Sequence, residues 1–298
     1  MLRLNKTISL ITSFWRILAT RDHWDTIALE AEKDEIAKRE EYLRRTARNW
    51  VAHYTENKTY DFIAEVIQNH VKLERGAKIL DIGCGPGKWV RFFANKGFEV
   101  MGIDFSPLMI RLAERRIEGK YGKLVKFHVM DVTNLNLPSN FYDLVNCITV
   151  LQHILNDKDQ MKAVQEMVRV TKPLGHILIY EAAPIFILKK RTPRLRFRTM
   201  KEYISMFEKA GTYLTYWRAA DLSFPITFLF LRRYSFSFSR KAYYYSADEH
   251  PLFPPNLRSF LSKIVAITAR PIDYKIARTP LGLLSIHKIL LFRKTKSS

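Results

Sequence analysis

Cysteine is scarce in this chain of 298 residues, which contains only Cys84 and Cys147. Both lie in apolar stretches, and this favours buried thiols over a disulfide and fits a reducing compartment. Cysteine and histidine do not recur at the spacing of a zinc site, so we expect no structural zinc and no other metal. No apolar run reaches the roughly 18 residues that a membrane-spanning helix needs.

Acidic residues are also few beside basic ones: 29 Asp and Glu face 49 Lys and Arg, a formal net charge of +20. Such a surface attracts phosphate-bearing partners such as nucleic acid, anionic lipid or phosphorylated metabolites, although an uneven basic surface without such a partner stays open. Hydrophobic residues make up 47% of the chain, which is enough for an ample core. The length allows one large or two modest domains.

The segment from Lys78 to Gly87 (KILDIGCGPG) carries the most information. An apolar strand ends in Asp81, and a glycine-rich turn then leads into an amphipathic helix from Lys88 to about Lys96. Glycine lets the backbone turn tightly and brings amide groups close to a ligand. A second strand over 98–103 ends in Asp104, where a carboxylate is placed to bind ribose hydroxyls. Together these features predict a nucleoside site.

Two common phosphate-binding patterns do not fit the turn. The dinucleotide fingerprint G-x-G-x-x-G fails at Lys88, and the P-loop pattern fails at Ile82 and Trp89. Asp81, directly before the turn, would repel a pyrophosphate and would suit a ligand that carries an ammonium group.

Strands and helices alternate along the chain, which predicts parallel βαβ units and a doubly wound sheet. Ligands of such sheets bind beyond the carboxyl ends of the strands. The residues expected at those ends are Asp81, Asp104, Asp131, Ile148 and Glu181. The expected strands are 78–81, 98–103, 125–130, 142–148, 176–181, 212–218 and 286–292, and the expected helices are 60–71, 88–96, one from Ser106, 159–170 and 199–210.

The turn resembles motif I of the class I S-adenosylmethionine-dependent methyltransferases, and further matches follow in order over about residues 50–220. The segment LQHI around His153 is similar to the family's LxH stretch. The segment from Arg169 to Gly175 resembles its R-x-L-K-P-G-G turn, with Leu174 where the family prefers glycine. Residues 286–292 look like its last, antiparallel strand. The resemblance implies a Rossmann-like α/β fold, a doubly wound, seven-stranded and mostly parallel sheet, with an N-terminal helical extension and an insertion before the last strand.

The resemblance also implies the cofactor S-adenosyl-L-methionine and a role for each residue of its site. Asp81 would handle the amino-acid end of the cofactor, Asp104 the ribose, and Asp131 the adenine amino group. The glycines would let the backbone approach the cofactor, and Val132 and Ile148 would line it. The full set of expected cofactor-binding residues is Asp81, Gly83, Gly85, Gly87, Asp104, Phe105, Asp131, Val132 and Ile148.

His153 and Glu181 are the candidate catalytic residues. A base is needed only if the acceptor is a hydroxyl or a protonated amine. Each residue also has a structural interpretation, His153 as a cap of its turn and Glu181 as the end of a strand at the rim of the pocket. The Pro-Cys of cytosine-C5 enzymes and the Asn/Asp-Pro-Pro-Tyr of amino-methylating nucleic-acid enzymes are absent, since Asn146 is followed by Cys147.

Four segments are expected: an N-terminal helical extension over 1–49, a core over 50–221, an aromatic and basic insertion or lid over 222–280, and the last strand with a basic tail over 281–298. Residues 1–20 show helical apolar spacing. They could cap the pocket, lie on a membrane surface or direct organelle import, and we favour a docked or interfacial helix. Residues 22–48 are highly charged and read as a solvated connector.

Two later segments bear on the acceptor. Residues 189–198 contain six basic residues in ten, which predicts either a clamp for an anionic acceptor or a solvated loop. The aromatic stretch within 222–280 is interpreted as a lid over the acceptor pocket that could contact lipid. A buried subdomain and an oligomer interface remain equally open.

The sequence therefore predicts a methyltransferase that acts on an anionic or hydrophobic small molecule or lipid. The alternatives are an RNA methyltransferase, a non-catalytic S-adenosylmethionine-binding partner subunit, or transfer of another group from a related nucleoside donor. Nucleic acid is not favoured as a partner. We expect a cytoplasmic protein, with peripheral membrane contact or organelle import as alternatives, and the sequence predicts neither an oligomeric state nor the methylated atom.

Overall fold

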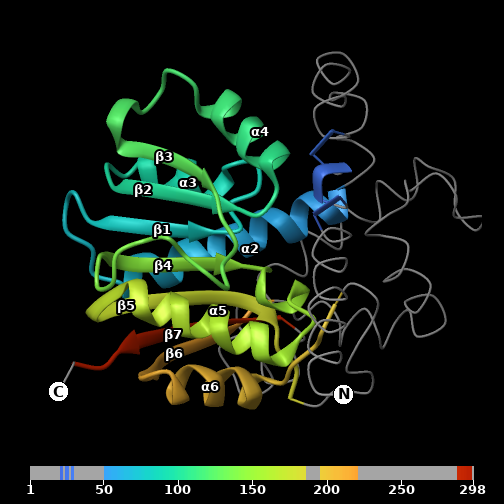
Figure 1. Ribbon diagram of the computed structural model, residues 1–298, viewed down its shortest axis with the longest axis vertical. Helices are drawn as coiled ribbons and strands as arrows, with labels where there is room; N and C mark the ends of the chain where they lie inside the picture. The colour runs from blue at the N-terminus through green and yellow to red at the C-terminus, as the bar shows by residue number, and fades with distance from the viewer. Residues whose placement is uncertain are drawn as a thin grey trace, which may run out of the picture.

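A seven-stranded sheet with the order β3-β2-β1-β4-β5-β7-β6 forms the centre of the molecule (Figure 1). The computed structural model describes residues 21–22, 24–26, 28–29, 50–185, 195–220 and 287–296. The first five strands are parallel, and β7 runs antiparallel to both β5 and β6. The strands are β1 Lys78–Ile82, β2 Glu99–Asp104, β3 Val125–Val129, β4 Tyr142–Ile148, β5 Thr171–Ala182, β6 Thr212–Ala219 and β7 His287–Lys294.

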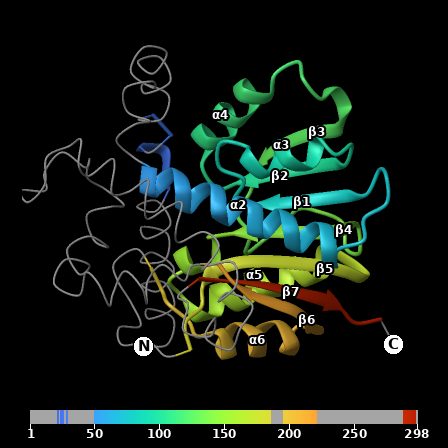
Figure 2. The ribbon, with the colours of Figure 1, turned by 180° about the vertical axis from the view of Figure 1, so that it is seen from behind.

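Helices cover both faces of the sheet, as Figures 1 and 2 show from opposite sides. The hydrophobic cluster on one face includes side chains of α2 (Trp50–His70), α3 (Lys88–Ala94) and α4 (Pro107–Ile117). The cluster on the other face includes side chains of α5 (Asp157–Val170) and α6 (Met200–Lys209). A short 3-10 turn, η2 (Leu151–His153), follows β4, and another, η1 (Gly122–Leu124), precedes β3.

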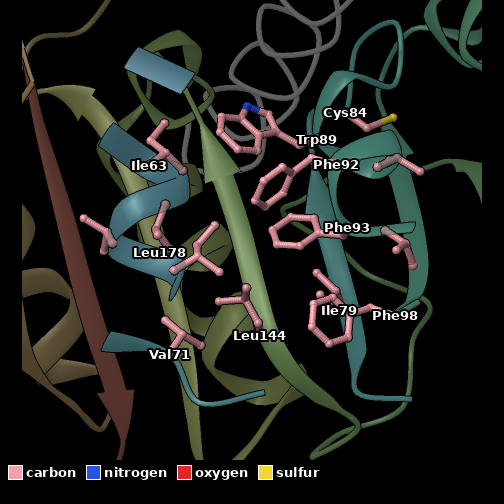
Figure 3. Close-up of a cluster of buried hydrophobic side chains, with 14 of the residues drawn as sticks. Ile63, Val71, Ile79, Cys84, Trp89, Phe92, Phe93, Phe98, Leu144 and Leu178 are labelled. Atoms are coloured by element: carbon pink, nitrogen blue, oxygen red, sulfur yellow. The ribbon is translucent and has the colours of Figure 1, made fainter. Parts of the chain in front are cut away.

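Successive residues of the central strands enter opposite clusters, because side chains alternate across a sheet. Leu144 belongs to the cluster shared with α2 and α3, whereas Val145 belongs to the cluster under α5 and α6. Figure 3 shows the first cluster, in which Trp89, Phe92 and Phe93 of α3 lie over the strands. Strands covered on both faces need near-continuous apolar sequence, and this explains why β1 and β4 lack the alternation of a half-exposed strand.

Local sequence signals place the ends of the helices. Ser106 caps α4 by accepting a hydrogen bond from the backbone N–H of Met109 at 3.1 Å. Asn156 caps α5 in the same way, and Thr199 with Glu202 forms a capping box at the start of α6. These caps satisfy N–H groups that have no partner within the helix.

The predicted fold class is confirmed, and all seven expected strands are present. Two boundaries differ from the prediction more than the others do. β5 begins at Thr171 rather than at residue 176, because Thr171 pairs with Tyr142 and the turn at Leu174 (φ 62°) is accommodated as a register shift. α2 begins at Trp50, ten residues before the expected start.

Both cysteines are free and buried, as expected. Within the described ranges, no helix has the length and apolar character needed to cross a bilayer. Residues 1–20, 30–49 and 222–280 lie outside the described residues, so the predictions for the N-terminal amphipathic stretch and for the aromatic insertion remain predictions.

Candidate functional site

The carboxyl ends of β1, β2, β4 and β5 lie along one edge of the sheet, here called the carboxyl edge. In Figure 1 the arrowheads of β1 and β4 point to this edge, and the described pieces of the N-terminal segment lie on the same side. Met130 donates its N–H to the Asp104 carbonyl oxygen at 3.0 Å, which fixes the end of β3 beside the end of β2. Residues that are far apart in the sequence therefore meet at this edge.

The glycine turn after β1 adopts a backbone that only glycine enters readily. Gly83, Gly85 and Gly87 have φ values of 65°, 49° and 82°. A Cβ added to Gly85 would meet no atom of the described residues within 4 Å, so this part of the chain leaves the space over Gly85 open to a ligand. A Cβ added to Gly83 would instead lie 2.3 Å from Cγ2 of Val150, so this glycine lets the segment after β4 pack against the turn.

Asp104 is held in place by two backbone donors. Gly85 donates its N–H to Oδ2 at 2.9 Å, and Ser106 donates its N–H to Oδ1 at 2.9 Å. A carboxylate oxygen has two lone pairs, so each oxygen retains an acceptor position. Burial raises the pKa of Asp104 against the effect of these donors. The geometry suits a ligand with two neighbouring hydroxyls, and the ribose-binding role of Asp104 stays a prediction.

Asp81 is 1% exposed and lies just before the turn. Asn146 donates its amide N–H to Oδ1 at 2.7 Å, whereas Oδ2 has no hydrogen-bond partner among the described residues. Burial, with a smaller contribution from the charge of Asp104, raises the pKa of Asp81 to about 7. A positively charged ligand beside this carboxyl would favour its ionised form.

Asp131 and its neighbours lie next to the end of β3. Thr133 donates its N–H to Asp131 Oδ1 at 2.8 Å, which orients the carboxylate. Val132 is buried in the cluster under α5, and Ile148 is half-buried at the end of β4. The structure therefore places the predicted cofactor residues along one edge, but no ligand contact tests their roles.

Glu181 and His153, the candidate catalytic residues, have different positions. Glu181 is fully buried, and its carboxylate accepts the backbone N–H groups of Val150, Leu151 and Gln152 at 2.8, 2.7 and 3.2 Å. Burial raises its pKa to about 8. Its position is that of a cap for η2, and its catalytic role stays a prediction. His153 is half-buried and is the last residue of η2, so the hydrogen bonds that Glu181 accepts also fix His153 at the carboxyl edge.

The described part of the N-terminal segment contacts the site at three points. The Arg21 guanidinium lies 5.6 Å from the ring centroid of Phe105, and Asp25 accepts a hydrogen bond from the Ser106 hydroxyl. The Trp24 indole meets the His153 ring edge-to-face with centroids 5.1 Å apart. These residues pack on the core, whereas sequence reasoning expected a solvated connector over 22–48.

A signal for this contact was present in the sequence. Trp24 and Ala28 are spaced four residues apart in an otherwise charged segment, and Ala28 is 2% exposed. Such a pair lies on one face of a helix.

Part of the basic segment expected to clamp an anionic acceptor has another partner. Arg196 and Arg198 both bind the carboxylate of Asp157 at the start of α5. Arg196 also donates its backbone N–H to the Gln152 carbonyl oxygen at 2.8 Å. These two arginines fasten residues 195–198 beside η2. Residues 189–194 lie outside the described residues, so their role as a clamp stays a prediction.

Comparison with known proteins agrees with this geometry. Residues 79–175 match a family model described as a methyltransferase domain. The mitochondrial ubiquinone biosynthesis O-methyltransferase of Schizosaccharomyces pombe is 30% identical over 176 residues, which cover 57% of this chain and 60% of that protein. A probable tRNA methyltransferase 9B of Mus musculus is 26% identical over 156 residues, which cover 51% of this chain and 31% of that protein. The chain therefore spans less than two thirds of the length of these relatives.

A solved structure shares the fold over most of the chain. It is the putative methyltransferase in complex with the Haloferax volcanii Trm112 methyltransferase activator, with a TM-score of 0.54 and 14% identity. The similarity covers 94% of this chain and 98% of that chain.

Proposed function

We propose that the chain is a class I S-adenosylmethionine-dependent methyltransferase that transfers the methyl group to a hydrophobic or anionic small molecule or lipid. The observation that carries the proposal is the arrangement of Asp104. Its two oxygens are oriented by Gly85 and Ser106 directly beside the open position over Gly85. This arrangement is suited to a ribose next to a close approach of the backbone.

The site residues fit S-adenosylmethionine better than a phosphorylated dinucleotide. The unused Oδ2 of Asp81 is a buried acceptor that suits a cationic ligand, and Asp81 and Asp104 are near enough for each to influence the other's charge. A pyrophosphate would be repelled by the same two carboxyls. The cofactor carries an ammonium and a sulfonium group, and both favour ionised carboxylates.

The cofactor supplies an already electrophilic methyl group, so the chain has to hold the acceptor in line and to exclude water. Glu181 holds η2 against β5 by its three accepted hydrogen bonds, and η2 presents His153. Trp24 packs on the His153 ring from the N-terminal segment. We propose that this ring pair borders the acceptor, and that His153 receives the proton if the acceptor is a hydroxyl.

A hydrophobic acceptor is supported by the ring pair and by the relatives. The yeast relative is named as an O-methyltransferase of ubiquinone biosynthesis, a pathway with hydrophobic intermediates. An indole and an imidazole at the mouth of a site give apolar surface with polar edges, which suits a ring-bearing acceptor.

RNA is the second candidate acceptor. The net charge of +20 favours a polyanionic partner, and one relative is named as a probable tRNA methyltransferase. Against it stands the absence of the nucleic-acid methylation signatures noted above.

The test is unbiased label transfer with methyl-tritiated S-adenosylmethionine. The purified chain is incubated with separate lipid, polar-metabolite and RNA fractions of a cell extract. We expect label in the lipid or metabolite fraction, and none with Asp104→Ala as enzyme. Label confined to RNA would replace the proposal with the second candidate, and cofactor binding without label in any fraction would indicate a binding module.

A matched binding measurement separates a wrong cofactor from a wrong acceptor. Calorimetry with S-adenosylhomocysteine reports on the cofactor site alone. If the protein ignores that compound but retains a nicotinamide or a flavin, the proposed function is wrong as a whole.

A further inference from the structure

A hollow lies at the opposite edge of the sheet from the candidate cofactor site. The parallel strands begin at this edge, which is here called the amino edge. It has a volume of about 520 Å³ and is formed by the end of α2, the beginnings of β4 and β5, and the end of β7. In Figure 1 the arrowhead of β7 points to this edge, away from the carboxyl ends of β1 and β4. The residues that line it are Asn69, His70, Lys72, Leu73, Asp143, Lys172, Pro173, Leu174, Gly175, His176 and Arg293.

Positive charge dominates this hollow. Among the described residues that line it, Lys72, Lys172 and Arg293 are the permanent cations and Asp143 is the one carboxylate. Both oxygens of Asp143 are already engaged, Oδ1 by Nζ of Lys172 at 2.7 Å and Oδ2 by the backbone N–H of Lys78 at 2.8 Å. Once Lys172 has neutralised Asp143, two positive charges remain in the lining.

Arg293 keeps most of its hydrogen-bonding capacity. Its Nε donates to the carbonyl oxygen of Leu174 at 3.0 Å, and this bond fixes the direction of the side chain. The structure shows no partner for its two terminal nitrogens among the described residues. A guanidinium held by Nε presents these nitrogens as a fork that matches the oxygens of a phosphate.

Two imidazoles, those of His176 and His70, also line the hollow. His176 pairs with Arg293 across β5 and β7. Burial and the nearby guanidinium hold the pKa of His176 below its usual range, so this ring is a neutral donor at pH 7. His70 lies at the end of α2, with its ring stacked on Tyr216 at 3.8 Å between centroids.

Lys294, the next residue of β7, is a cation whose hydrogen bonds stabilise the fold and are not available to a ligand. Its Nζ donates to the carbonyl oxygens of Val168 and Thr171, both at 2.8 Å, and to Asn140 Oδ1 at 2.6 Å. Lys294 therefore closes the end of α5 on the sheet. Lys72 is exposed, and the structure shows no such internal contacts for it among the described residues.

We propose that the hollow at the amino edge is a binding site for the phosphate group of a small phosphorylated molecule. Two net positive charges match a dianionic phosphate, and the Arg293 fork with Lys72 supplies charged donors from two different elements. The volume lies in the range of small-molecule pockets, about 300 to 1,000 Å³. This site is separate from the carboxyl edge, and the proposal does not depend on the proposed methyl transfer.

Pyrophosphate is the probe for the test, with the full chain observed by calorimetry and by the side-chain resonances of His176 and His70. We expect saturable binding at constant ionic strength and a shift of both resonances. Arg293→Gln and Lys72→Gln should each weaken binding by about tenfold or more, since a hydrogen bond to a charged group contributes about 1.5–3 kcal/mol.

Lys201→Gln is the matched control, because Lys201 is an exposed lysine on α6 outside the hollow. It removes the same charge and should leave the pyrophosphate affinity unchanged. Arg293→Lys keeps the charge without the fork, so it should bind between the wild type and Arg293→Gln. Unchanged thermal unfolding and unchanged S-adenosylhomocysteine binding would show that each variant is folded.

Equal loss of affinity in Lys201→Gln and Lys72→Gln would overturn the proposal, because it would show attraction by net charge alone. Non-saturable binding of pyrophosphate would also overturn it. If a short single-stranded RNA bound far more tightly, with a steep salt dependence that Arg293→Gln reduced, the edge would be a nucleic-acid surface instead.

Discussion

The two edges of the sheet gather different ionisable groups although the chain as a whole is strongly basic. The carboxyl edge gathers the carboxyl groups of Asp81, Asp104, Asp131 and Glu181, whereas the described lining of the amino-edge hollow has more cations than carboxylates. The fold therefore places these carboxyl groups and the cations of the hollow at opposite ends of the strands. A net charge of +20 describes the whole surface but does not describe the cofactor site.

The edges also differ in how their charged groups are held. At the carboxyl edge, backbone N–H groups fix the carboxylates, as with Gly85 and Ser106 on Asp104. At the amino edge, side chains such as Lys172 and Arg293 are partly exposed and make few internal bonds. Groups held by the backbone are oriented before a ligand arrives, so changes at the carboxyl edge should have the larger effects.

Asp104→Ala is expected to have the largest effect on the carboxyl edge. It removes both remaining acceptor positions for a ribose and leaves the N–H groups of Gly85 and Ser106 without their partner. The affinity for S-adenosylhomocysteine should fall by about a hundredfold or more, since two hydrogen bonds to a charged group are lost. Calorimetry measures the affinity, and the control is Asp159→Ala, at a partly exposed residue of α5 that pairs with Lys162. Wild-type affinity in Asp104→Ala would show that the ligand lies elsewhere.

Glu181→Gln should have the next largest effect. An amide has one acceptor oxygen, so at least one of the N–H groups of Val150, Leu151 and Gln152 loses its partner. Unfolding free energy should fall by about 1–3 kcal/mol, measured by denaturant titration. Glu208→Gln, an exposed change on α6, should have no measurable effect. If Glu181→Gln abolished methyl transfer but left both stability and the position of η2 unchanged, Glu181 would have a chemical role instead.

Cofactor binding should depend on pH through Asp81. Its pKa in the free protein is raised from 3.8 to about 7, and a bound cation lowers it again. Binding near pH 7 should therefore release protons, and affinity should rise between about pH 6 and pH 8, by about tenfold for each unit by which the pKa falls. Calorimetry in two buffers with different ionisation enthalpies measures the released protons. Asp81→Asn should remove the effect.

The same raised pKa affects the protein without ligand in the opposite direction. The folded state holds the Asp81 proton more tightly than the unfolded state does. This contribution to stability is therefore present below about pH 4 and is lost as the pH rises through about 7. A ligand-free stability that increases through this window in the wild type relative to Asp81→Asn would contradict the assignment.

Asp25→Asn tests the contact of the N-terminal segment with the carboxyl edge. It weakens the hydrogen bond from the Ser106 hydroxyl, and Ser106 also donates its N–H to Asp104. The affinity for S-adenosylhomocysteine should fall several-fold, in line with about 0.5–1.5 kcal/mol for one hydrogen bond. Cleavage of the N-terminal segment by protease should become faster. Asp22→Asn, an exposed change in the same segment, should leave both measurements unchanged.

Asp143→Asn should give the smallest effect and sharpens the contrast between the edges. Asp143 and Lys172 are both partly exposed, so the ion pair itself contributes little, and we expect a loss of about 1 kcal/mol or less in unfolding free energy. Cofactor affinity should not change. A large loss of cofactor binding would show that the two edges are coupled through β4.

Much of the fold followed from the sequence because its signals are local. The apolar strands, the glycine turn and the start of α4 at Ser106 are determined by neighbouring residues. The boundary of β5 was predicted less well, since Leu174 continues the strand through an irregular turn that propensity does not indicate. The position of the antiparallel last strand was predicted through the family resemblance.

The roles of side chains that act across the fold were harder to predict. Glu181 was expected at the rim of the pocket, but its donors lie about 30 residues earlier, and only the pairing of β4 with β5 brings them together. The contact of Trp24 with His153 joins two residues that are far apart in the sequence. The role of the Arg293 side chain depends on the hollow around it. A local pattern can show that a side chain lies on a packed face, but it does not show which distant residue that side chain meets.

The missing side chain of Gly83 has one more consequence. A methyl group of Val150 occupies the space that a side chain at Gly83 would fill. The glycine turn after β1 and the segment that leads to His153 are therefore in direct contact. A methyl group can pass between two molecules only if both are positioned to within a fraction of an ångström. In this chain the contact between the Gly83 backbone and the Val150 side chain sets the distance between the glycine turn and the segment after β4. A Cβ atom at Gly83 would push these two segments apart.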